Sequence, residues 1–165
     1  MTTVFKKSTP LGLFGFFICL AACSSPQPSM ETKNEATDRA IYAAMDAGES
    51  AKFDQYCAAD FQINNPFLPT PGGLDVFKGL MQGQKAAFPD VKHELVQVFS
   101  KGNLVCTRGV YSGTNTGPMQ GNPPTGNKVS LPFIVIDEFN TEGKLKTRYV
   151  QFDAGAFNAQ MMAKK

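Results

Sequence analysis

Apolar residues recur along this chain first at helical spacing and later at strand spacing. The first helix is expected around Ala36 to Met45, where apolar residues return every three or four positions. A second short helix is expected from Ser50 to Ala58, and a third from Leu74 to Phe88. The short segment Phe61 to Asn64 alternates apolar and polar residues and predicts a strand. Pro89 ends the third helix because its ring cannot continue the helical hydrogen-bond pattern.

The second half of the chain predicts four longer strands, at residues 91–99, 104–111, 129–139 and 145–152. Glycine-containing turns separate them, which favours an antiparallel meander over crossovers through helices. A short C-terminal helix is expected over residues 154–162. Helices first and a curved sheet afterwards indicate an α+β fold in which the helices pack against the sheet.

Alternation along the last strands predicts which side chains share a face. One face of the final strand is expected to carry Leu145, Thr147, Tyr149, Gln151 and Asp153. One face of the strand before it is expected to carry Val129, Leu131, Phe133, Val135 and Asp137. We expect Tyr149 and Asp153 to face inward together, towards a pocket.

The N-terminus has the pattern of a bacterial lipoprotein signal. Lys6 and Lys7 precede an apolar run, Leu11 to Ala22, that is too short to cross a bilayer as a helix. The run closes with Leu-Ala-Ala and then Cys23, the lipobox pattern in which the cysteine receives lipid. A plain signal peptide with a free Cys23 is the alternative. We therefore expect a signal peptide over 1–22, a lipidated flexible tether over 23–36, and a folded domain over 37–165, held at the outer membrane and facing the periplasm.

Charge and cysteine content exclude several other functions. The chain has 16 basic and 14 acidic residues, and removing Lys6 and Lys7 leaves 14 of each. A neutral mature protein with no basic block argues against nucleic acid as a partner. His93 is the single histidine, which argues against a zinc site, and no cofactor is expected. Cys57 and Cys106 either form a disulfide or remain free thiols.

Several short motifs, in order, resemble those of a known family. They follow three helices and precede a strand that ends in Asp153: Phe88-Pro89-Asp90, Gly113-Thr114-Asn115-Thr116-Gly117, Pro124-Thr125-Gly126 and Gly143-Lys144-Leu145. Together they make residues 37–162 similar to the SnoaL-like polyketide (ester) cyclases of the nuclear transport factor 2-like superfamily. The resemblance implies a cone-shaped fold whose curved, mixed sheet and three N-terminal helices enclose an apolar pocket. It also implies a homodimer formed through the sheet.

The same resemblance suggests roles for individual residues. In the cyclases an Asp of the last strand acts as general base, and Asp153 stands at that place. Tyr149 matches a position usually held by Trp and would line the pocket, together with Asn115, Arg108, Asn65 and Phe133.

Departures from the family pattern weaken the catalytic interpretation. Asn115 stands where many relatives have His, and an amide cannot transfer a proton at neutral pH. Asn64-Asn65-Pro66 resembles a His-Asn-Pro element whose His is missing, and Thr147 replaces a common acidic residue. His93 matches no acid–base position of the cyclases and is interpreted as a solvated residue at a strand edge.

Two candidate residues have structural alternatives. Asp153 could be a general base, a ligand anchor, or the cap of the helix that follows it. Arg108 could meet an acidic ligand group or form a structural ion pair.

Three functional hypotheses follow. The first is a membrane-anchored lipoprotein whose SnoaL-like domain binds a small, largely apolar molecule. The second is an enzyme of cyclase or isomerase type with Asp153 as base. The third is a dimeric interaction module without chemistry.

Overall fold

The computed structural model describes residues 1–3, 28–119 and 121–164. The helical elements are α1 (Met30–Ala47), the 3-10 turn η1 (Ser50–Lys52), α2 (Phe53–Tyr56), α3 (Leu74–Ala87) and α4 (Ala154–Met161). The strands are β1 (Cys57–Asn64), β2 (Lys92–Lys101), β3 (Leu104–Thr114), β4 (Lys128–Phe139) and β5 (Leu145–Phe152). Cys23 and residues 4–22 of the expected signal peptide lie outside the described residues. Within the described part, no helix combines the length and apolar character needed to cross a membrane.

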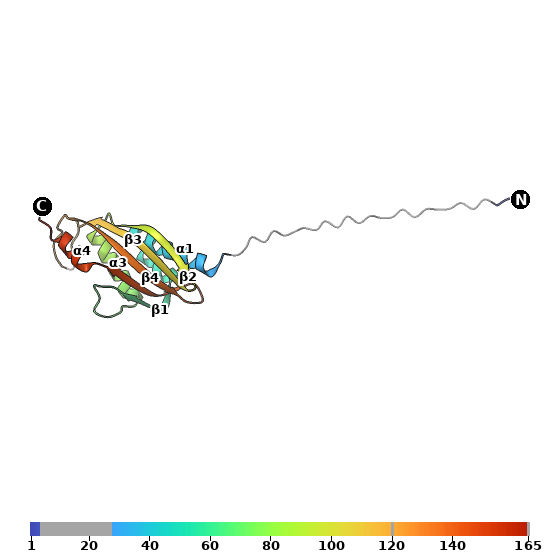
Figure 1. Ribbon diagram of the computed structural model, residues 1–165, viewed down its shortest axis with the longest axis horizontal. Helices are drawn as coiled ribbons and strands as arrows, with labels where there is room; N and C mark the ends of the chain where they lie inside the picture. Colours follow the sequence, from blue (N-terminus) through green and yellow to red (C-terminus); the bar gives the residue numbers. More distant parts are fainter. Residues whose placement is uncertain (4–27, 120, 165) are drawn as a thin grey trace.

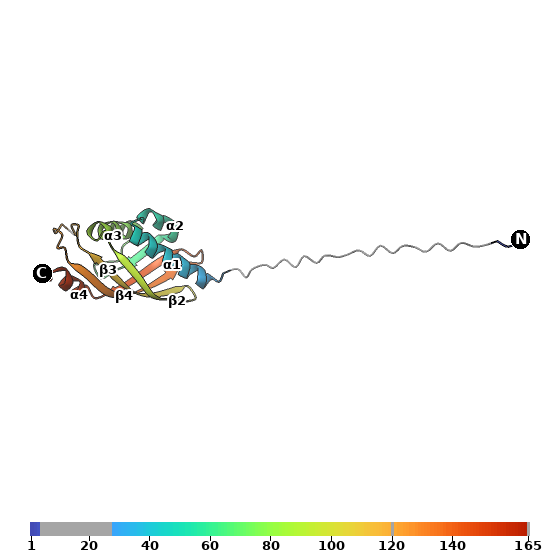
Figure 2. The same cartoon turned by 90° about the horizontal axis from the view of Figure 1, so that it is seen from above.

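A single five-stranded sheet in the order β1-β5-β4-β3-β2 forms the base of the fold. Strands β2 to β5 form the predicted antiparallel meander, and β1 joins β5 in parallel. Helices α1, α2 and α3 cover one face of this sheet, while α4 lies at the end remote from the N-terminus (Figures 1 and 2). The expected α+β architecture is confirmed.

Most of the core lies between α1, α3 and the inner face of the sheet. The predicted alternation holds along β4, where every second residue from Val129 to Asp137 is buried. The same alternation is present along β3, where Val105, Thr107 and Tyr111 are buried. Among the described residues, no helix lies over the outer face of the sheet (Figure 2).

The predicted faces of β5 were wrong because of a β-bulge at its start. Leu145 pairs with Phe139 and Thr147 pairs with Glu138, so Lys146 is an extra residue in the ladder. A bulge of this kind shifts the alternation by one position. After it, Arg148 is buried with the inward-facing residues, whereas Tyr149 is 46% exposed on the outer face.

The first helix begins at Met30, earlier than the apolar pattern predicted. Its first turns are held by polar contacts to the β2–β3 hairpin. A Glu31 carboxylate oxygen accepts from the backbone N–H of Gly102 at 2.6 Å, and Glu35 accepts from the Ser100 hydroxyl at 2.6 Å. Apolar spacing cannot reveal such contacts. The folded part therefore includes residues that were assigned to the tether.

The second predicted helix is also shorter than expected. Its helical turns end at Tyr56, and Cys57 already belongs to β1, opposite Leu145. Cys57 and Cys106 are both free thiols, which answers the question that the sequence left open.

Candidate functional site

A cavity of about 520 Å³ lies between the inner face of the sheet and helices α1 and α3. Its walls are mostly apolar and include Leu80, Met81, Leu131, Val150, Phe152 and Phe157. Six polar or amphipathic side chains also contribute to its lining: Tyr42, Asn65, Gln84, His93, Tyr111 and Arg148. A volume of this size suits a small organic molecule.

Two glycines on α3 form part of the cavity wall where it meets solvent. Gly79 and Gly83 are one helical turn apart, line the cavity and are exposed. A Cβ atom placed on either would have no atom within 4 Å. Glycine weakens a helix, yet α3 has two glycines here. Because glycine has no side chain, both leave space beside the cavity.

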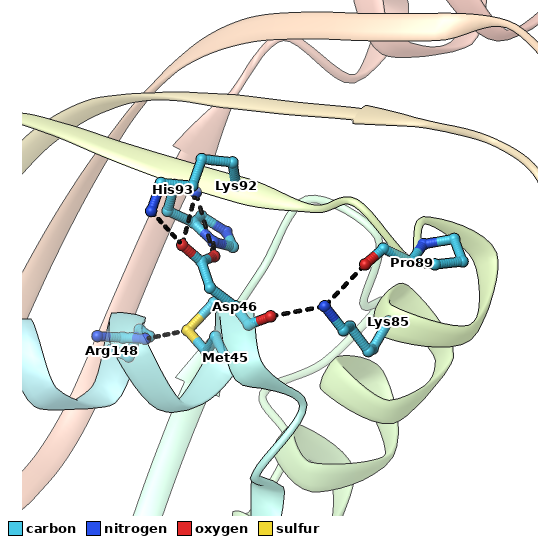
Figure 3. A network of polar contacts seen from close by, with 7 residues as sticks. All are labelled: Met45, Asp46, Lys85, Pro89, Lys92, His93 and Arg148. Atoms are coloured by element: carbon cyan, nitrogen blue, oxygen red, sulfur yellow. Dashed lines mark hydrogen bonds and ion pairs between the residues drawn. The ribbon is translucent and has the colours of Figure 1, made fainter.

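Arg148 belongs to a buried ion cluster in the wall of the cavity. Its Nε and Nη2 donate to Asp137 Oδ1 and Oδ2 at 2.9 and 2.5 Å, and Nη2 also donates to Asp38 Oδ1 at 3.2 Å. Its Nη1 lies 3.4 Å from the sulfur of Met45 (Figure 3). The guanidinium carbon also lies 5.0 Å from the centre of the Tyr42 ring. A buried guanidinium with two carboxylates is compensated in charge and holds α1, β4 and β5 together.

Asp38 is the carboxyl group of this cluster that more readily holds a proton. Burial, followed by repulsion from Asp137, raises its pKa from the ordinary 3.8 to about 8, although Arg148 acts in the opposite direction. The Thr107 hydroxyl donates to Asp38 Oδ2 at 2.6 Å. One guanidinium thus balances one ionised carboxylate, with Asp38 protonated near neutral pH.

The second polar feature of the cavity is a pair formed by His93 and Asp46. Nδ1 of His93 lies 2.6 Å from Asp46 Oδ1, and the backbone N–H of His93 donates to both oxygens of that carboxylate at 3.1 Å (Figure 3). Burial raises the pKa of Asp46, but the hydrogen bonds from His93 outweigh it, so the net shift is downward. Asp46 therefore remains a carboxylate at neutral pH.

Aromatic side chains surround the imidazole of His93. The ring centres of Tyr42, Tyr111 and Phe133 lie 5.4, 5.5 and 5.8 Å from that of His93. Phe133 comes this close partly because Gly109 faces it across the ladder: a Cβ at Gly109 would lie 2.5 Å from the Phe133 ring. The ring of His93 is thereby held in one place in the cavity wall.

Of the residues predicted for the pocket, the structure places two in the cavity lining. Asn65 and Phe133 line it. Asp153 is exposed and caps α4, with its carboxylate accepting from the Ala156 N–H at 2.8 Å. Tyr149 lies on the outer face, as does Arg108, which donates to Gln97 at 3.0 Å.

Asn115 is buried but serves the loop that follows β3. Its amide nitrogen donates to the carbonyls of Ala87 and Gly117, and its amide oxygen accepts from the Thr125 N–H. This position requires a side chain that donates and accepts at once, so Asn115 is a latch between the loop and the end of α3.

His93 and Arg148 were not predicted as cavity residues, although the sequence contained a signal for each. Val91, just before β2, alternates with His93 and Leu95 within it, which places His93 on the apolar side. Arg148 alternates with Val150 and Phe152, which was the apolar face of β5. His93 shares this side with apolar neighbours, whereas Arg148 reaches the inner face through the bulge at Lys146.

The family model for SnoaL-like polyketide cyclases matches residues 35–161. The chain belongs to the SnoaL-like polyketide cyclase family. This SnoaL-like domain accounts for nearly all of the described fold. No curated protein matches the chain significantly.

Solved structures with the same fold come from several bacteria. A protein assigned as a SnoaL-like polyketide cyclase from Jannaschia sp. CCS1 superposes with a TM-score of 0.75 at 16% identity, covering 86% of this chain and 99% of that one. TsrD from Streptomyces laurentii gives a TM-score of 0.69 at 19% identity, covering 80% and 96% of the two chains. IdmH from Streptomyces antibioticus, assigned as a polyketide cyclase, gives 0.67 at 24% identity, covering 79% and 99%. At these identities the likeness establishes the SnoaL-like fold.

Proposed function

We propose that this protein is a membrane-anchored lipoprotein whose SnoaL-like domain binds a small, largely apolar molecule. The observation that supports binding is the cavity of about 520 Å³, with its mainly apolar walls and few polar groups. The apolar walls would supply affinity, and His93, Asn65 and Gln84 would orient a ligand that carries a polar group.

A neutral fluorescent probe, N-phenyl-1-naphthylamine, tests the cavity directly. The mature protein purified in detergent is titrated with the probe against a detergent blank, and we expect saturable binding. Gly79→Trp places an indole beside the cavity and should weaken binding by about tenfold or more, a loss of about 1.4 kcal/mol. Gly79→Ala is the matched control, because a methyl group meets no atom within 4 Å and should leave binding nearly unchanged.

Two results would contradict the binding proposal. One is the absence of saturable binding to the wild-type protein. The other is equal affinity in wild type and Gly79→Trp, which would place the probe elsewhere. Native mass spectrometry of protein purified from its own host then identifies a molecule that remains bound.

The anchor is proposed from the lipobox ending in Cys23. Metabolic labelling with a radioactive fatty acid should label the wild type and leave Cys23→Ser unlabelled. Density-gradient separation of inner and outer membranes tests the expected outer-membrane location. Labelling of Cys23→Ser at the wild-type level would contradict lipidation at this residue.

A homodimer through the outer face of the sheet is a further part of this proposal. Phe99, Cys106, Ile136 and Tyr149 are direct neighbours in the ladders of β2, β3, β4 and β5, and they form a row across that face. Three of them are large and about half exposed: Phe99 at 57%, Ile136 at 44% and Tyr149 at 46%. A contiguous apolar row on an uncovered sheet face is typical of an interface.

A further inference from the structure

We propose that His93 is a general base in the cavity, positioned by Asp46, and that it removes a proton from the molecule bound there. This inference rests on the proposed binding function. The substrate class is a small apolar molecule with a weakly acidic C–H bond. The proposal names His93 in place of Asp153 as the candidate base, because Asp153 is exposed at the start of α4.

The contacts of His93 determine which ring nitrogen carries the proton. The Asp46 carboxylate only accepts hydrogen bonds, and it lies 2.6 Å from Nδ1, so Nδ1 carries the hydrogen. Nε2 then holds the lone pair. Among the described residues no hydrogen-bond partner occupies Nε2, and the ring forms part of the cavity wall. Once Nε2 takes a proton, the Asp46 carboxylate stabilises the resulting imidazolium.

A purely structural role would not require the imidazole. The backbone N–H of His93 already donates to both oxygens of Asp46, which ties the end of α1 to the start of β2. The side chain of His93 adds a polar ring to a wall made largely of apolar groups, enclosed by Tyr42, Tyr111 and Phe133. A ring held in this way in an apolar cavity is poised for proton transfer.

The charged and titratable groups around the pair set its pH response. On β2, Lys92 Nζ lies 3.6 Å from Asp46 Oδ2, and Glu94 is exposed. From α3, Lys85 Nζ donates to the backbone carbonyl of Asp46 at 2.6 Å (Figure 3). Burial raises the pKa of Tyr42 on α1 and of Tyr111 on β3, so both phenols are neutral. Asp46 is thus the anion in direct contact with His93.

The test uses 5-nitrobenzisoxazole, a small apolar carbon acid that reports general bases. His93 Nε2 would take the proton from the ring C–H, and the C–H electron pair would form the C≡N bond. The N–O bond breaks, and the oxygen leaves with its electrons as a coloured cyanonitrophenolate. The proton on Nε2 is then released to water, so the protein is unchanged.

The rate of phenolate formation is measured for the mature protein in detergent. We expect His93→Gln to lower the rate by about 10²-fold, the lower end of the range for a general base. Glu94→Gln, at the exposed neighbouring position, is the matched control and should keep the wild-type rate. Equal rates in wild type and His93→Gln would overturn the proposal.

Asp46→Asn tests the positioning role through the pH profile. The rate should depend on pH, because only the unprotonated imidazole can take a proton from the substrate. Removal of the carboxylate destabilises the imidazolium, so the midpoint of the profile should move to lower pH. An unchanged midpoint would show that Asp46 does not act on the base.

A chemical experiment on the wild type needs no variant. His93 is the single histidine, so carbethoxylation by diethyl pyrocarbonate can be counted from its ultraviolet absorbance. We expect reaction in the folded protein, protection by N-phenyl-1-naphthylamine, and loss of the elimination rate in proportion to modification. Full modification with the rate retained would overturn the proposal. Probe binding without elimination would contradict only the role of His93 as general base. Absence of probe binding would contradict the proposed binding function.

Discussion

Arg148 and Asp137 form a two-pronged ion pair in the core, with Nε–Oδ1 and Nη2–Oδ2 distances of 2.9 and 2.5 Å and both residues 1% exposed. The pair joins adjacent strands β5 and β4 beneath α1. A buried charge without its partner is expensive, so this geometry makes the fold sensitive to either residue.

Arg148→Met should therefore destabilise the protein strongly. The change leaves Asp137 and Asp38 buried without a cation, and we expect the free energy of unfolding to fall by roughly 3–5 kcal/mol. Urea denaturation followed by circular dichroism measures it. Arg108→Met is the matched control, because Arg108 is exposed and its side chain contacts Gln97; its cost should stay within about 0.5 kcal/mol. Similar costs for the two variants would contradict the buried-pair interpretation.

Asp38 should make stability fall as pH rises. Its pKa in the folded protein is raised from 3.8 to about 8, so the folded state holds this proton more tightly than the unfolded state. The resulting stabilisation is complete below the unfolded pKa and is lost as pH rises through the folded pKa. The difference in free energy of unfolding between the wild type and Asp38→Asn, measured by urea denaturation from pH 4 to pH 9, should therefore decline as pH rises. A flat difference would contradict the raised pKa.

Asn115→Ala should loosen the loop after β3. The substitution leaves the carbonyls of Ala87 and Gly117 and the Thr125 N–H without their amide partner. Buried groups that lose a partner cost about 1–3 kcal/mol each, and partial hydration of this loop leaves a total of roughly 2–4 kcal/mol. Denaturation measures the loss, with exposed Asn158→Ala on α4 as control. A cost equal to that of the control would exclude the latch.

Ile136→Lys should separate the proposed dimer. A lysine in the middle of the apolar row places a charge opposite its copy across a two-fold interface, whereas the monomer should be little affected because Ile136 is 44% exposed. Sedimentation velocity in density-matched detergent gives the mass. Met162→Lys, at another exposed apolar residue away from the sheet, should keep the wild-type mass. A wild-type monomer would contradict the dimer itself.

Local patterns in the sequence predicted the elements and the inner face of β4. Asp137 was placed correctly because alternation runs unbroken along β4. Arg148 was placed on the wrong face because the bulge at Lys146 depends on how β5 pairs with β4. Apolar spacing does not reveal pairing of that kind.

The candidate site was predicted less well, since its polar groups meet across long distances in the chain. His93 and Asp46 are 47 residues apart, and Arg148 and Asp38 are 110 apart. The spacing of apolar and polar residues along the chain does not show which distant residues pair. Asn65 and Phe133, which the family resemblance assigned to the pocket, do line the cavity.

The extra residue at Lys146 has a consequence for how this protein can be compared with its relatives. Losing that one residue would leave Leu145 opposite Phe139, Thr147 opposite Glu138 and Arg148 opposite Asp137, in a ladder without a bulge. Arg148 would thus stay on the inward face of β5, and its guanidinium would stay in the cavity wall. A relative with one residue fewer in this strand can therefore present the same inward side chains, and the pairing register decides which residues correspond.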